Sequence, residues 1–393
     1  MDEQIRTFRR RLDRELGIPE GKTFEDWLNQ VFRNPTTEQP IELSEFLSHL
    51  DIRSFLKVFE RIYPRFRIVE ARLGPRLKFA LFLAGKGCGR VTEGHRLLKD
   101  ERTRRNLGFK EEPTYEVLRE FINEKLPLVM DDLCKVVLVE LKRELERNGL
   151  PAFKHLANDA TDLRARKTDK EAEFSGYYKE YGYKEDIVLD MDNYIPARWT
   201  NTGINYCEGY CLPGHLEALA ELGIHPETLT VDGKYSTYEN IAIAHMRYGV
   251  RLVYKILDDW VWNPKGEPPE IKHRYQAYRN EPGFKSDAEV REMLDMLFKM
   301  GDYEHVGAYF RNDAMTRYRE NPEKYLAEYH RRNTIEGHNN RIKNETHMEK
   351  NIPKGQKKVA HHASLCLLFL QMVALNRLQH GVKGNLGSVV HLT

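Results

Sequence analysis

Four side chains in the stretch YHRRNTIEGHNNRIK have types and spacing that could act on a phosphate group. They are Tyr329, Arg332, Glu336 and Lys343, at intervals of three, four and seven residues. Because a helix turns by about 100° per residue, these intervals predict one stripe roughly 60° wide along ~21 Å of a single helix. The stripe would carry a carboxylate between two cations, with a phenol beside them.

Two aspartates earlier in the chain could join this glutamate. Asp159 lies in LANDATD at the end of a candidate strand, and Asp232 ends TLTVD, where Thr230 and Asp232 share one face. Carboxylates that converge at a sheet edge repel one another unless divalent cations neutralise them, and oxygen ligands suit Mg²⁺ or Mn²⁺. Enzymes that catalyse in-line displacement at a phosphate group commonly use two such ions about 3.5–4 Å apart. The predicted catalytic metal ligands are Asp159, Asp232 and Glu336, and the predicted phosphate-binding residues are Tyr329, Arg332 and Lys343.

Each of these features also has an ordinary explanation. An aspartate after a strand is usually a turn residue, and a Tyr/Arg/Glu stripe is ordinarily a solvated face with i,i+4 ion pairs. What favours the chemical interpretation is the ordered combination of two strand-end aspartates followed by the four-residue pattern.

The elements that must position these residues are short strands after Pro151. The strand-like runs are FKHLANDATDLRA, KEDIVLDMDN, IPARWT, TLTVDG and VRLVYKI. YENIAIAHMRYG between the last two predicts a helix and hence a β-α-β step. SDAE, residues 286–289, is a capping box that opens a helix, and Asn321 with Pro322 begins the helix of the four-residue pattern.

The region before Pro151 predicts helices instead. Within it, DERTRRNLGFKEEPTYEVLREFINEK predicts two short helices joined by a turn at Gly108 and Pro113, with Thr114 as N-cap. This suits a DNA-binding helix-turn-helix, although helical hairpins are also common packing units. Residues 61–110 hold 14 Lys/Arg against 4 Asp/Glu, and residues 331–360 hold 8 against 3, in a chain of net charge +2. The two basic regions indicate contacts with a polyanion.

Composition sets the wider limits. The 393 residues suggest two or three domains, and the charged N-terminus has no apolar core of a secretory signal. Five cysteines indicate reduced thiols in a cytoplasmic protein. Cys207, Cys211 and His215 have a spacing that suggests zinc, but a fourth ligand is missing, so an unliganded loop is favoured. The run ASLCLLFLQMVAL, residues 363–375, is too short to span a bilayer and predicts a buried C-terminal helix.

The pattern Tyr329-x2-Arg332-x3-Glu336-x6-Lys343 resembles the signature of DDE transposases from bacterial insertion sequences. DATD resembles the segment of the first aspartate, GYYKEYGYKEDIVLD the following strand, and TVDGKY the segment of the second aspartate. The resemblance covers roughly residues 100–380. Two positions depart from the usual pattern, Glu185 for a histidine and Asn339 for an aromatic residue.

The resemblance implies an α/β fold: an RNase H-like core, a mixed five-stranded sheet flanked by helices, with an all-helical N-terminal region and an insertion before the Glu-bearing helix. The expected domains are 1–150, helical and DNA-binding; 151–257, the first part of the core; 258–320, the insertion; and 321–393, the C-terminal helices of the core. In the insertion, Trp260 or Trp262 could stack on a flipped base, although buried packing is the more ordinary role.

The implied function is a transposase that cuts and joins double-stranded DNA at element ends and target, with two Mg²⁺ or Mn²⁺ ions. A homodimer on DNA is expected, and neither a membrane nor a small-molecule substrate. Two alternatives stay open: an RNase H-fold endonuclease without strand transfer, and a DNA-binding regulator with an inactive core.

Overall fold

The computed structural model describes residues 41–62, 70–256, 287–350 and 352–384, together with 386, 387, 389 and 392. The chain forms two compact units. The first comprises Met1–Ala152, Asn193–Ile195 and Arg341–Thr393, and the second comprises Phe153–Asp192 and Pro196–Asn340. The predicted division into four domains, with boundaries at 150, 257 and 320, stays a prediction. Those boundaries separate regions by function, whereas the two units are defined by contacts within the chain.

The first unit is helical. Two of its helices, α5 (Glu70–Gly85) and α9 (Met130–Arg147), pack against α17 (Gln356–Gln379), which carries buried side chains along most of its length. The predicted buried C-terminal helix is therefore present, but with 24 residues it is longer than the apolar run suggested. Within the described residues it is the one helix long and apolar enough to cross a membrane, and 78% of its apolar window is buried in the protein. The other helices are α3 (Leu43–Ser48), α4 (Arg53–Ile62), α6 (Val91–Leu97), α7 (Glu101–Asn106) and α8 (Tyr115–Glu120), the last continued by a π-helical turn (Phe121–Lys125) and a 3₁₀ turn (Leu126–Leu128).

The helical pair predicted around Gly108 is α7 and α8. Gly108 has φ +89°, a conformation that favours glycine, so the turn falls where the sequence predicted it. Thr114 is the N-cap residue of α8, but its side chain makes no capping hydrogen bond. Asp100 caps α7 by accepting from the Thr103 N–H.

The second unit is built on a mixed sheet. Strand β1 (His155–Arg164) pairs antiparallel with β3 (Glu180–Asp190) and parallel with β5 (Thr228–Val231), which pairs parallel with β6 (Arg251–Tyr254). Strand β4 (Ile195–Gly203) pairs with β3, giving the order β4-β3-β1-β5-β6. The short β2 (Glu173–Ser175), which the sequence analysis missed, also pairs with β3. This confirms the predicted α/β class with a mixed five-stranded sheet, and the sheet is compatible with an RNase H-like fold.

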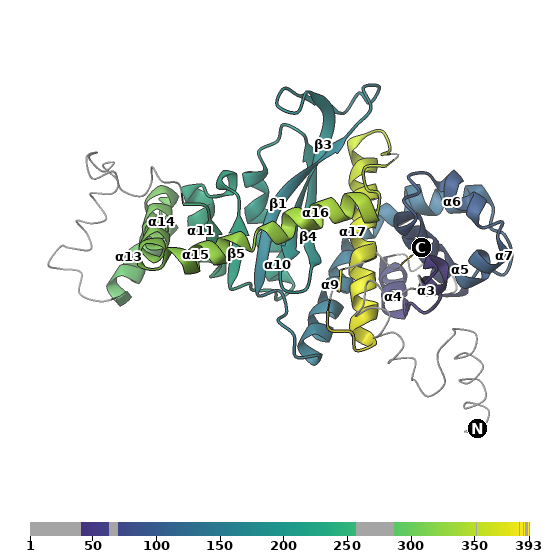
Figure 1. The fold of residues 1–393 in the computed structure, drawn as a ribbon, viewed down its shortest axis with the longest axis horizontal. Helices are drawn as coiled ribbons and strands as arrows, with labels where there is room; N and C mark the ends of the chain where they lie inside the picture. Colours follow the sequence, from purple (N-terminus) through teal and green to yellow (C-terminus); the bar gives the residue numbers. More distant parts are fainter. Residues whose placement is uncertain are drawn as a thin grey trace, which may run out of the picture. The chain divides into compact units, whose positions relative to one another are not determined.

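Opposite faces of this sheet are covered by different helices. Ile335, on α16 (Asn333–Glu345), packs against Ala157 of β1 and Leu189 of β3. His215, on α10 (Leu212–Glu221), contacts Asp186 of β3. Because successive side chains of a strand point to opposite faces, Leu189 and Asp186 put α16 and α10 on different sides. Figure 1 shows α16 crossing the sheet at β1.

The predicted β-α-β step is present as β5, α11 (Tyr238–Tyr248) and β6. Beside α11 lie α13 (Asp287–Lys299) and α14 (Tyr303–Glu320), with Val306 and Leu294 packed on Ala242 (Figure 1). Gly307 lets α14 approach closely, because a Cβ there would lie 2.1 Å from the Tyr238 carbonyl oxygen. Trp260 and Trp262, and the Ser286 of the capping box, lie outside the described residues.

Candidate active site

Asp159 lies on β1, on the face that α16 covers. Its side chain is 17% exposed, and burial raises its pKa from 3.8 to about 6. The guanidinium of Arg332 acts in the opposite direction but does not outweigh the loss of hydration. Asp232 adds to the increase by repulsion, so the two aspartates are close enough to influence each other.

Asp232 directly follows β5, and the turn after it is held in several ways. Its carboxylate accepts a hydrogen bond from the Gly233 N–H at the start of the 3₁₀ turn η4 (Gly233–Tyr235). Lys234 pairs with Glu208 at 2.9 Å, and the Tyr235 hydroxyl donates to Asp186. These contacts fix the backbone on which Asp232 is carried.

Arg332 joins the first and third predicted carboxylates. Its Nη2 lies 3.2 Å from Asp159 Oδ1, and its Nη1 lies 3.1 Å from Glu336 Oε1. Asp232 and Tyr329 also raise the pKa of Arg332 electrostatically. The structure thus gathers Asp159, Asp232, Tyr329 and Glu336 around one half-buried guanidinium.

The single helix predicted through residues 329–343 is wrong. Helix α15 (Pro322–His330) ends one residue after Tyr329, and α16 begins at Asn333, so Arg332 occupies the turn between them. There the N–H groups of Arg332, Thr334 and Ile335 bond to the carbonyl three residues back instead of four. Arg331 and Arg332 are held by different carboxylates, those of Asp192 and Asp159, and neither Asn333 nor Thr334 is a strong helix former. The predicted start of α15 is confirmed, with Asn321 accepting from the Lys324 N–H and Pro322 in the first turn.

Lys343 stands on α16 seven residues after Glu336, in the part of the chain that belongs to the first compact unit. Its ammonium pairs with Glu349 at 2.7 Å. Of the four residues in the pattern, Tyr329 and Glu336 therefore interact with Arg332. Lys343 instead forms a salt bridge with Glu349.

The residues around Arg332 suit a hard divalent cation. Asp159, Asp232 and Glu336 offer carboxylate oxygens alone, the donor type that Mg²⁺ and Mn²⁺ prefer. The position is already one that attracts positive charge, since two of the carboxylates hold the guanidinium of Arg332. Within the described residues, the group whose three donor atoms lie mutually within 4.8 Å is a different one, Asp186, Cys211 and His215.

The sequence singled out Cys211 and His215, with Cys207, as a possible zinc site but favoured an unliganded loop, and Asp186, which lies in a predicted strand, was not included. Asp186 is fully buried and accepts hydrogen bonds from Asn158 at 2.6 Å, from His215 at 2.9 Å and from the hydroxyl of Tyr235. Beside it, Lys184 pairs with Glu208 at 2.6 Å. The signal that could have found Asp186 is KED, residues 184–186, three consecutive charged residues in the middle of a strand.

No protein-family model matches the chain, and no curated protein matches it in sequence.

Proposed function

We propose that the protein is a DDE transposase that cuts and joins DNA at the ends of an insertion sequence. The observation that carries the proposal is the guanidinium of Arg332 between Asp159 and Glu336, with Asp232 close by. It brings residues separated by up to 177 positions to one place, in the combination that the sequence pattern predicts. A sheet compatible with the RNase H-like fold supports the same proposal.

In this proposal Asp159, Asp232 and Glu336 hold two Mg²⁺ or Mn²⁺ ions. When bound, such ions activate a water or a 3′-hydroxyl and stabilise the leaving oxygen. Arg332, Tyr329 and Lys343 bind phosphate oxygens of the DNA backbone and orient it. Burial holds Asp159, and the hydrogen bonds around Tyr235 hold the turn that carries Asp232, whereas Glu336 is held by Arg332.

The test is strand nicking on DNA that flanks the coding region, by Asp159→Asn, Asp232→Asn and Glu336→Gln beside wild type. Each nearly isosteric change removes one charge that a cation needs, so nicking should collapse while DNA binding survives. Mg²⁺ or Mn²⁺ should support nicking, whereas Ca²⁺, which is larger and looser in coordination, should support binding with little cleavage.

Asp162→Asn is the matched control, because Asp162 lies three residues along β1 and faces the other side of the sheet. It should nick like wild type. Near-normal nicking by any of the three carboxylate variants would remove that residue from the site. Transfer of the cut end into a plasmid distinguishes a transposase from an endonuclease, and DNA binding without any metal-dependent nicking would identify a regulator.

A further inference from the structure

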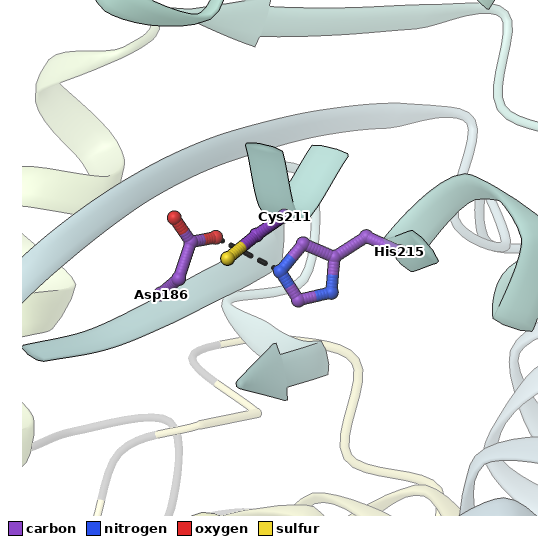
Figure 2. Close-up of side chains that lie close together, drawn as sticks. All are labelled: Asp186, Cys211 and His215. Carbon is purple, nitrogen blue, oxygen red and sulfur yellow. Dashed lines mark hydrogen bonds and ion pairs between the residues drawn. The ribbon is translucent and has the colours of Figure 1, made fainter. Parts of the chain in front are cut away.

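A second group of donor atoms lies on the opposite face of the sheet from Asp159. Asp186 of β3, Cys211 just before α10 and His215 on α10 have donor atoms within 4.8 Å of one another. Figure 2 shows the carboxylate and the imidazole facing each other, with the thiol beside them. Asp186 and His215 are 0% and 1% exposed, and Cys211 is half-buried.

The geometry is close to that of a metal centre. Three atoms mutually within 4.8 Å share a centre no more than about 2.8 Å from each, compared with roughly 2.0–2.3 Å for zinc–ligand bonds. To complete a tetrahedral site the sulfur must move inward, while the imidazole nitrogen and the carboxylate oxygen, 2.9 Å apart, must separate by a few tenths of an ångström. One carboxylate oxygen, one imidazole nitrogen and one sulfur are donors that zinc accepts together, and three protein ligands leave a fourth position for water.

The surroundings also resemble the outer shell of a metal site. The Tyr235 hydroxyl donates to Asp186 Oδ2, which leaves Oδ1 directed at His215. Asn158 also donates to Oδ1, so the carboxylate is oriented from three sides. Outer-shell hydrogen bonds of this kind fix the orientation of metal-binding side chains.

We propose that Asp186, Cys211 and His215 bind a zinc ion. Binding releases the proton of the Cys211 thiol, and His215 must present an unprotonated Nε2 with its remaining proton on Nδ1, because zinc is bound by thiolate and by an unprotonated ring nitrogen. Burial, with Asp186 nearby, raises the pKa of Cys211 to about 12, so the ion itself must drive ionisation of the thiol.

Such an ion would tie three separate segments together. It joins β3 to the start of α10, and through Tyr235 it supports the turn that carries Asp232. The site is separate from the oxygen-lined group around Arg332, and it does not depend on the proposed function.

The experiment uses the full chain, stripped with a chelator and titrated with Co²⁺ as a spectroscopic probe. Wild type should bind one equivalent with thiolate-to-cobalt charge-transfer absorption, and Zn²⁺ should displace it. Cys211→Ser should abolish that absorption, and Tyr235→Phe should weaken binding by roughly tenfold or more. Zn²⁺ should raise the Tm of wild type but not of Cys211→Ser.

Two matched variants locate the ion. Cys207→Ser removes an exposed thiol four residues before Cys211 and should leave the absorption unchanged. Asp159→Asn should also retain it, which separates this site from the proposed active site. Absence of saturable, thiolate-bound Co²⁺ in wild type would overturn the proposal, as would absorption that survives Cys211→Ser and disappears in Cys207→Ser. His215→Ala should weaken binding too, and if it fails to fold, Cys211→Ser still decides.

Discussion

Glu185 lies on β3 with its carboxyl group fully buried, where the Asn201 amide donates a hydrogen bond to Oε2 across 2.8 Å. Burial raises its pKa from 4.5 to about 8. The folded protein therefore retains a proton that the unfolded chain loses above its ordinary pKa. Since the folded state then binds more protons than the unfolded state, stability falls as the pH rises from about 4.5 to about 8.

Glu185→Gln should remove this pH dependence, because an amide does not ionise and keeps an acceptor for Asn201. The variant should become more stable relative to wild type as the pH rises. The measurement is the Tm of the variant minus the Tm of wild type, followed from about pH 5 to about pH 9. Glu217→Gln, an exposed change on α10, serves as the control. Parallel Tm profiles of Glu185→Gln and wild type across this range would contradict the argument.

Arg332 and Arg331 are adjacent but have different partners, so they form a matched pair of variants. Arg332→Ala removes the charge shared by Asp159 and Glu336, and with it a proposed phosphate contact. Loss of a charge-assisted hydrogen bond of about 1.5–3 kcal/mol should slow nicking roughly ten- to a hundredfold.

Arg331→Ala breaks the salt bridge to Asp192 and should leave nicking by the folded protein near wild type. Equal losses in the two variants, measured per folded molecule, would show that the turn between α15 and α16 acts only as structure.

At the scale of elements, two helical glycines should respond in opposite directions to the same substitution. Gly307→Ala places a methyl group 2.1 Å from the Tyr238 carbonyl oxygen, so α14 must move away from α11 and stability should fall by about 1–3 kcal/mol. Gly337→Ala on α16 meets no atom within 4 Å and should raise helix stability by about 0.5–1 kcal/mol. Denaturant unfolding of both variants checks the signs, and a stabilised Gly307→Ala would mean that the close approach of α14 and α11 is not needed.

At the scale of the whole molecule, the basic surplus of residues 61–110 gives a salt-dependent prediction. Arg96, Lys99 and Lys110 have exposed side chains in this region. If they contact phosphates, changing all three to Gln should reduce the slope of log affinity against log salt by about 2–3. Fluorescence anisotropy with duplex DNA measures it, and Lys154→Gln in the other compact unit is the control.

This measurement needs the full chain. A fragment ending near residue 150 lacks α17, which packs against α9 and α5, so the apolar faces of those helices would lose their cover. An unchanged salt slope in the triple variant, with the fold intact, would remove this surface from DNA binding.

Much of the fold follows from local patterns. Five of the strands, the β-α-β step through α11 and the start of α15 at Asn321 and Pro322 appear where apolar alternation and helix caps predict them. Strand β2 was not predicted, because three residues are too few to show an alternating pattern. The break after His330 was not predicted either, because calculating angles around a helix axis assumes that the helix is continuous.

The sequence by itself determined the strand periodicity and the ordered set Asp159, Asp232 and Glu336, since both depend on residue types at fixed short intervals. Only the tertiary structure decided which side chains meet. The register of β1 and β3 sets Asp159 and Asp186 on opposite faces, Arg332 reaches a carboxylate 173 residues away, and His215 reaches Asp186 from another element. Such contacts depend on how distant segments pack. A pattern that repeats every two or 3.6 residues identifies a strand or a helix and its apolar face, but it does not specify which distant segment packs against that face.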